Sequence, residues 1–152
     1  MVDILRLRAM VEAIAADTGF TGEIHCGEPM AAHTTFKVGG PADLWVRPSG
    51  DSFPGFAAAL LGQARSMGIP LFILGGGANL VVADQGIRGI VLDATGWSGC
   101  FAASGDCGEA SVTVRAGTAV DEAVEAAAKQ GWGGLEFLAG MPGTVGGAVW
   151  MN

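Results

Sequence analysis

The placement of glycine constrains this chain more than any other feature of its sequence. The 152 residues include 26 glycines, and several of these stand together instead of being spread evenly. Three consecutive glycines, at positions 75–77, directly follow the apolar run 71–74. A turn without Cβ atoms adopts positive φ and lets another group approach its backbone closely. The sequence therefore predicts a buried parallel strand that ends in a tight loop with accessible backbone.

This first glycine loop is predicted to bind an anion. Successive N–H groups in such a turn form a concave site suited to a pyrophosphate, and Asn79 tolerates the left-handed conformation. The loop has neither a Rossmann nor a P-loop spacing, because Leu80 occupies the sixth position and no Gly-Lys-Ser/Thr follows. A tight turn without a ligand is the alternative. The predicted cofactor-binding residues of this loop are Gly75, Gly76, Gly77, Ala78, Asn79 and Leu80.

A second glycine-rich loop lies near the end of the sequence. Pro142 fixes φ, Gly143 frees the next turn, and Thr144 is suited to cap a short helix. A helix start with free N–H groups would make a second anion site, whereas close helix packing explains the same glycines equally well. The predicted cofactor-binding residues here are Gly140, Met141, Pro142, Gly143, Thr144, Gly146, Gly147 and Ala148.

The apolar periodicity predicts an α+β chain. Gly19, Gly68 and Gly131 are predicted to end the three helices, Thr118 is predicted to cap the third, and residues 22–40 are expected to be irregular. The first two strands and the helix between them form a predicted βαβ unit with a right-handed crossover. The predicted elements are helices around residues 7–14, 53–67 and 120–127 and strands over residues 42–46, 71–74, 87–92 and 111–114. The predicted division is an N-terminal helix over residues 1–22, a first lobe over 23–85 and a second lobe over 86–152.

Composition excludes several classes of protein. A net charge of −7 argues against nucleic-acid binding, which depends on basic surface. Cys26, Cys100 and Cys107 are odd in number and lack a CxxC spacing, so neither a metal site nor a disulfide framework is indicated. The first ten residues lack a signal-peptide core, and the uncharged stretches are interrupted by glycine and proline. The sequence therefore predicts no membrane segment and a cytoplasmic location.

A third segment, His-Thr-Thr-Phe-Lys-Val-Gly-Gly-Pro-Ala-Asp at residues 33–43, enters the first predicted strand. Together with residues 74–80, 114–118 and 140–152, it resembles the UDP-N-acetylenolpyruvoylglucosamine reductase family over nearly the whole chain beyond residue 30. The resemblance implies a two-lobed FAD-binding domain of the vanillyl-alcohol-oxidase (PCMH) type, incomplete at its C-terminus. It also implies that FAD lies between the lobes, with its pyrophosphate on the first glycine loop and the second loop on the other side.

The resemblance implies a reaction as well. In that family NADPH reduces FAD, and the flavin then reduces the enolpyruvyl double bond of a UDP-sugar to give UDP-N-acetylmuramate for peptidoglycan synthesis. FAD is expected to be non-covalent here, because neither His25 nor His33 stands in a glycine loop. Members of the family are longer, and their substrate domain and catalytic residues lie beyond the part matched. We therefore predict no catalytic residue in this chain, weak FAD binding, no activity alone and a tendency to self-associate.

Two other functions fit the same residues. The first is another FAD oxidoreductase of this fold, such as a hydroxy-acid or alcohol oxidase. The second is a non-catalytic nucleotide-binding remnant.

Several further side chains are expected to be structural. His33 is predicted to support the loop that it begins. Trp132, Trp150 and Met141 are predicted to pack in the core or between lobes, with flavin stacking as the second interpretation of Trp150. Four carboxylates are predicted to be simple loop or turn residues: Asp84, Asp93, Asp106 and Glu109.

Overall fold

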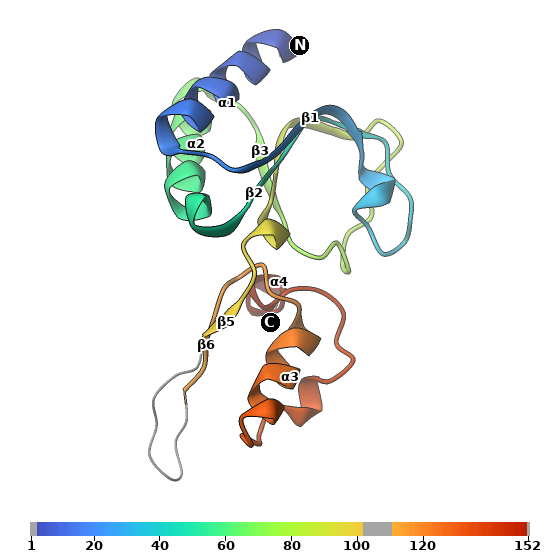
Figure 1. Ribbon diagram of the computed structural model, residues 1–152. Helices are drawn as coiled ribbons and strands as arrows, with labels where there is room; N and C mark the ends of the chain where they lie inside the picture. Colours follow the sequence, from blue (N-terminus) through green and yellow to red (C-terminus); the bar gives the residue numbers. More distant parts are fainter. Residues whose placement is uncertain (1–2, 102–110, 152) are drawn as a thin grey trace.

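The computed structural model of the chain describes residues 3–101 and 111–151 (Figure 1). A larger part at the N-terminal side holds a four-stranded sheet with two helices on one side of it, and a smaller part follows with a two-stranded hairpin and two helices. The helices are α1 Ile4–Thr18, α2 Phe53–Met67, α3 Val120–Lys129 and α4 Val145–Met151. The strands are β1 Gly22–Pro29, β2 Pro41–Pro48, β3 Leu71–Leu74, β4 Ile87–Asp93, β5 Cys100–Phe101 and β6 Thr113–Val114.

The first two helices end where the sequence predicts. Asp3 caps α1, because its carboxylate accepts a hydrogen bond from the N–H of Leu5. Gly19 and Gly68 follow α1 and α2 in the left-handed conformation, with φ of 63° and 64°. This conformation lets the glycine N–H bond back to the last turn and closes each helix.

The four-stranded sheet has the order β1-β2-β4-β3. β1 is antiparallel to β2, whereas β4 lies between β2 and β3 and is parallel to both. The sequence predicts that residues 87–92 begin the second lobe. The strand they form is instead an inner strand of the first sheet. Apolar strands of a parallel sheet look alike in sequence, so the pattern does not show which neighbours pair. The division into lobes stays a prediction.

The prediction of an irregular segment over residues 22–40 is wrong for its first part. Residues Gly22–Pro29 form β1, which pairs along β2 from Gly22 to Pro29. β1 is an edge strand with mostly exposed or half-buried side chains. It therefore lacks the apolar alternation by which a strand is recognised in sequence.

The core occupies both faces of the sheet. On one face, α1 and α2 bury Leu7, Val11, Phe56 and Leu60 against the strands; Leu44, Val46, Ile90 and Leu92 are the strand residues of this cluster. The other face holds a smaller cluster made of Met30, Ala42, Trp45, Leu74, Val82 and Val91. Alternation of side chains along β2 and β4 sends neighbouring residues to opposite faces.

Strand β3 is less buried than predicted. Only Leu74 is fully buried, while Phe72 and Ile73 are 38% and 56% exposed. The reason is topological: β3 lies at the edge of the sheet, so that its continuous apolar run is covered on one side only.

The smaller part differs from prediction at the start of α3. Ala119, not Thr118, occupies the N-cap position, and its side chain makes no capping bond. Thr118 is fully buried and bonds instead to both the N–H and the carbonyl of Gly99, at 2.9 and 3.1 Å. Thr118 therefore ties α3 to the segment before β5. No helix among the described residues is long and apolar enough to cross a membrane.

Candidate functional site

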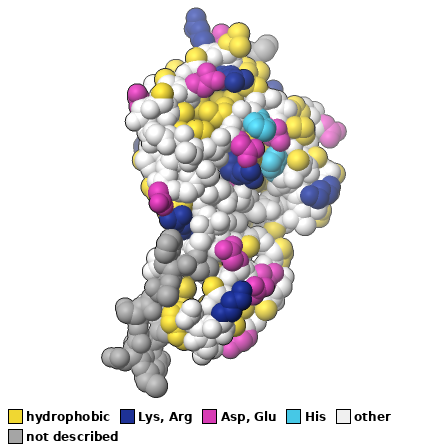
Figure 2. Space-filling view, viewed as in Figure 1, with side chains coloured by type: hydrophobic (Ala, Val, Ile, Leu, Met, Phe, Trp, Pro, Cys, Tyr) yellow, Lys and Arg dark blue, Asp and Glu magenta, His cyan; other side chains and the backbone are white. Residues whose placement is uncertain are grey.

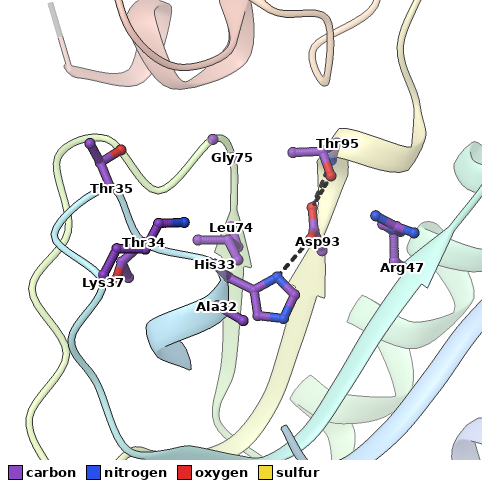
Figure 3. Close-up of a pocket in the computed structure, with 11 residues that line it drawn as sticks. Ala32, His33, Thr34, Thr35, Lys37, Arg47, Leu74, Gly75, Asp93 and Thr95 are labelled. Carbon is purple, nitrogen blue, oxygen red and sulfur yellow. Dashed lines mark hydrogen bonds and ion pairs between the residues drawn. The ribbon is translucent and has the colours of Figure 1, made fainter. Parts of the chain in front are cut away.

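Four stretches that are separate in sequence meet at one pocket of about 210 Å³ (Figure 3). The pocket opens at the carboxyl ends of the parallel strands β2, β3 and β4, which is where open α/β sheets bind their ligands. Figure 2 shows histidine, acidic and basic side chains gathered in one area of the first sheet's surface. The lining residues are Ala32, His33, Thr34, Thr35, Lys37, Arg47, Leu74, Gly75, Gly76, Asp93 and Thr95.

The two glycine loops touch each other beside this pocket. A Cβ atom on Gly75 would lie 2.5 Å from Oγ1 of Thr144, and one on Gly76 would lie 2.9 Å from Cα of Gly143. Both distances are too short for a side chain, so the contact requires glycine. The structure thus brings together the two loops for which the sequence predicts a shared ligand. The contact with a cofactor stays a prediction.

The first loop also packs on the segment that begins at His33. Gly77 has a φ of +65°, and a Cβ there would lie 2.0 Å from the carbonyl oxygen of His33. The carbonyl of Gly77 in turn accepts a hydrogen bond from the N–H of Thr35 at 3.1 Å. These contacts show that the third glycine of the loop and the His-Thr-Thr segment pack together without room for a side chain at position 77.

The donor groups of the pocket fit a diphosphate. Within the described residues, the N–H groups of Gly76, which lines the pocket, and of its neighbours Gly77 and Ala78 donate to no protein acceptor, so this turn can accept an anion. Lys37 and Arg47 add positive charge to the lining, and the Arg47 guanidinium is ion-paired with Glu23. Backbone N–H groups of a glycine turn together with cations are the recurrent chemistry of phosphate binding.

The second loop differs from prediction in one respect. Thr144 does cap α4, because its Oγ1 accepts from the N–H of Gly147 at 3.3 Å. The N–H groups of Val145 and Gly146, however, donate to the carbonyls of Thr118 and Ala116, each at 2.8 Å. These amides were expected to be free for an anion, but protein acceptors already use them. The start of α4 is therefore tied to the segment before α3.

Gly146 is explained by close helix packing, the alternative that the sequence left open for the second glycine loop. A Cβ there would lie 2.8 Å from the Cβ of Ala116, so Gly146 allows α4 to pack closely on that segment. Close helix packing thus accounts for at least one of the paired glycines in the second loop.

A chain of polar side chains crosses the pocket wall. His33 bonds through Nε2 to Oε1 of Glu28 at 2.9 Å, and its Nδ1 lies 3.9 Å from Oδ2 of Asp93. Oδ1 of Asp93 accepts from both the N–H and the hydroxyl of Thr95, at 2.8 and 2.6 Å. The ring of His33 also rests on the indole of Trp45, with 4.7 Å between centroids. This network confirms that His33 supports the loop it begins.

Asp93 is not the simple loop carboxylate that the sequence suggested. It is the last residue of β4, and only 3% of it is exposed. Its position at the end of an apolar strand, followed by Thr95, is the signal that could have identified it. Glu28 and Arg47 were also not predicted: Glu28 lies on β1, which the sequence pattern does not reveal, and Arg47 pairs with Glu23 only through the pairing of β1 with β2.

Glu28 is the residue of this network with a shifted pKa. The hydrogen bond from His33 holds the pKa of the Glu28 carboxyl below its ordinary value of 4.5, and the bond from His25 acts in the same direction. Burial opposes this shift without overcoming it.

We therefore expect the Glu28 carboxylate to stabilise the fold above about pH 4.5 and to lose that contribution as the pH falls through its lowered pKa. Urea unfolding of wild type and Glu28→Gln from pH 7 to pH 3 measures this. The wild type should be more stable at pH 7, and the difference should shrink at the acid end. A difference that stays constant over this range would contradict the assignment.

The remaining predicted residues do not gather at the pocket. Trp150 is 87% exposed and Met141 is also exposed, so neither packs in the core, and packing between lobes stays a prediction. Trp132 is half-buried, and Asp84 is an exposed turn residue as expected. The predicted loop carboxylates Asp106 and Glu109 lie outside the described residues, as does Cys107.

Besides the contact between the glycine loops, several side chains join the smaller part to the larger one. The ring of Phe53, at the start of α2, stacks on Trp97 with centroids 5.0 Å apart. Arg115 lies over the same indole and forms an ion pair with Asp51 at 2.6 Å. These contacts join the larger part, which carries the first glycine loop, to the smaller part, which carries the second. They therefore help to fix the two loops relative to each other.

The chain is similar to enzymes of known name. It is 42% identical over 135 residues to UDP-N-acetylenolpyruvoylglucosamine reductase of Moorella thermoacetica, a match that covers 89% of this chain and 42% of the relative. The enzyme of the same name from an Anaeromyxobacter species is 46% identical over 131 residues, covering 86% of this chain and 39% of the relative. The chain thus spans about two fifths of the length of these curated relatives.

A solved structure agrees with the sequence matches. The crystal structure of UDP-N-acetylenolpyruvylglucosamine reductase from Thermus caldophilus superposes with a TM-score of 0.54 at 30% identity, covering 86% of this chain and 41% of that one. The FAD binding domain family matches residues 57–152, which include both glycine loops. The sequence match, the fold and the paired loops agree, and the protein belongs to the FAD binding domain family.

Proposed function

We propose that this chain is the FAD-binding part of a reductase that converts UDP-N-acetylglucosamine enolpyruvate to UDP-N-acetylmuramate in peptidoglycan synthesis. The observation that carries the proposal is one pocket lined by the His33 segment, by Gly75 and Gly76 and by the cations Lys37 and Arg47, beside the contact between the two glycine loops. The names of the relatives supply the reaction. The fold places the pocket at the carboxyl edge of the parallel strands.

The residues of this chain would hold the cofactor rather than transform the substrate. Gly75, Gly76, Gly77, Ala78, Asn79 and Leu80 are proposed to hold the pyrophosphate through backbone N–H groups, with Lys37 and Arg47 balancing its charge. Gly143 and Thr144, which pack directly on the first loop, would approach the cofactor from beside that loop. FAD, when bound, supplies hydride transfer. No residue of this chain is assigned a catalytic role.

The finer features of the reaction belong to the same proposal. NADPH would deliver hydride to a non-covalently bound FAD, and the UDP-sugar would be held by a part of the enzyme that the matched region does not include. The reaction would take place in the cytoplasm and serve cell-wall growth, and hence cell shape and division. The exposed Val149 and Trp150 of α4 favour self-association of this chain when it is studied alone.

Titration with FAD tests the proposal. We expect quenching of flavin fluorescence at a ratio of one FAD to one chain, and weaker binding, by about tenfold or more, for Gly76→Ala, whose Cβ would meet Gly143. Gly62→Ala is the matched control, because Gly62 lies on α2 with no atom within 4 Å of the added Cβ. A folded wild-type chain that leaves flavin fluorescence unchanged would contradict the proposal.

A further inference from the structure

We propose that His33 and Asp93 together bind a sugar hydroxyl of the dinucleotide, and so form a second recognition point beside the glycine loop. The inference rests on the proposed function, since it concerns the same pocket. It adds a ligand group, and two residues that recognise it, to the backbone contacts already described.

The geometry of the two side chains points to a bridging group. Nδ1 of His33 and Oδ2 of Asp93 are 3.9 Å apart, which is too far for a direct hydrogen bond. An oxygen atom placed at about 2.8 Å from each would bridge them with ordinary hydrogen-bond lengths. Both residues line the pocket, and Figure 3 shows the imidazole of His33 facing the carboxylate of Asp93.

The other polar atoms of both side chains are already used. Nε2 of His33 is bonded to Glu28, and Oδ1 of Asp93 accepts two hydrogen bonds from Thr95. These bonds fix both side chains, and they leave Nδ1 of His33 and Oδ2 of Asp93 facing each other. The side chain of Asp93 is only 4% exposed, and within the described residues its Oδ2 accepts no hydrogen bond, so this oxygen is left to accept one from a ligand.

The charges select a hydroxyl instead of a phosphate. The carboxylate of Asp93 repels an anion but accepts an O–H, so a phosphate is better placed on the glycine loop near Lys37. When the His33 ring is protonated, a hydroxyl accepts from Nδ1 and donates to Asp93. When the ring is neutral and donates to Glu28, the diol of a ribose gives one O–H to each residue. A single hydroxyl therefore satisfies the pair when the ring is protonated, and a sugar diol satisfies it in both protonation states.

Two substitutions of His33 separate ligand binding from loop support. Asparagine retains a polar group near the position of Nδ1 but loses the bond to Glu28, whereas glutamine retains a group near Nε2 and loses Nδ1. A residue that only anchored the loop through Glu28 would tolerate glutamine better. A residue that binds a hydroxyl through Nδ1 should tolerate asparagine better.

The test measures dissociation constants of FAD, ADP and 2′,3′-dideoxy-ADP for the whole chain and its variants by calorimetry, with urea unfolding of each variant in parallel. We expect Asp93→Asn and His33→Gln to weaken FAD binding by about tenfold or more, and His33→Asn to stay within about threefold of wild type. The ligands identify the hydroxyl. If it belongs to the adenosine ribose, wild type prefers ADP over the dideoxy compound and Asp93→Asn loses that preference. If it belongs to the ribityl chain of the flavin, ADP binding is unchanged by the substitutions while FAD binding is weakened.

Two results would overturn the inference while leaving the proposed function intact. One is wild-type affinity for FAD in Asp93→Asn and His33→Gln. The other is weaker binding in His33→Asn than in His33→Gln, which would assign His33 to loop anchoring alone. A folded wild-type chain that binds no FAD would overturn the proposed function, and this inference with it.

Discussion

Replacing Gly77 by alanine is expected to lower the free energy of unfolding by about 3 kcal/mol and to abolish FAD binding. Two costs add. The left-handed φ of +65° is unfavourable for any residue with a Cβ, by about 1–2 kcal/mol. The Cβ would also lie 2.0 Å from the carbonyl oxygen of His33, so the loop or the His33 segment must move. Either movement displaces the N–H groups that we assign to the pyrophosphate.

Gly27→Ala is the matched control for this substitution. Gly27 has almost the same φ, +66°, but no atom lies within 4 Å of an added Cβ. We expect it to cost only the conformational term, about 1 kcal/mol, and to leave FAD binding unchanged. Urea unfolding and flavin fluorescence of both variants measure the difference. Equal effects of the two substitutions would show that close packing of the glycine loop on His33 is unimportant.

The largest effect on stability is expected for Phe56→Ala, at about 3–5 kcal/mol. Phe56 lies on the inner face of α2 and is fully buried in the cluster that joins both helices to the sheet. The centroid of its ring lies 4.6 Å from that of Phe20. Removing it leaves a cavity that neighbouring side chains fill only in part. Because domains are stable by about 5–15 kcal/mol in total, such a loss leaves the variant close to unfolding.

Phe137→Ala provides the comparison, since Phe137 is largely exposed. We expect a change within about 0.5 kcal/mol, as is usual for surface substitutions. Thermal unfolding followed by circular dichroism distinguishes the two variants. A small effect of Phe56→Ala would mean that the cluster between α1, α2 and the sheet contributes little to the stability of the fold.

The helices and glycine loops were predictable because their signals are local. Apolar spacing and a terminal glycine define α1 and α2, and three adjacent glycines identify the first loop without knowledge of their neighbours. The family was predictable from the order of the motifs. The pairing of strands was not, since nothing in residues 87–93 states that β4 separates β2 from β3.

The site was predictable only in its backbone part. The sequence identified the glycine loops but not the side chains beside them, because Arg47 pairs with Glu23 across β1 and β2, and Asp93 meets His33 only once β4 has joined the sheet. Free amides at the start of α4 were expected from helix geometry alone. Tertiary contacts with Thr118 and Ala116 use them instead, which no local rule anticipates.

The central position of β4 has a consequence for how the chain folds. β2 and β3 do not pair with each other. Each gains its parallel partner only when residues 87–93 insert between them as β4. Leu44 pairs with Ile90, a closure over more than forty residues that must precede the gain from its contacts. Folds dominated by such distant pairs form slowly. During synthesis the nascent chain therefore exposes one free edge of β2, whose other edge pairs with β1, and the whole of β3 until the last member of the sheet has left the ribosome.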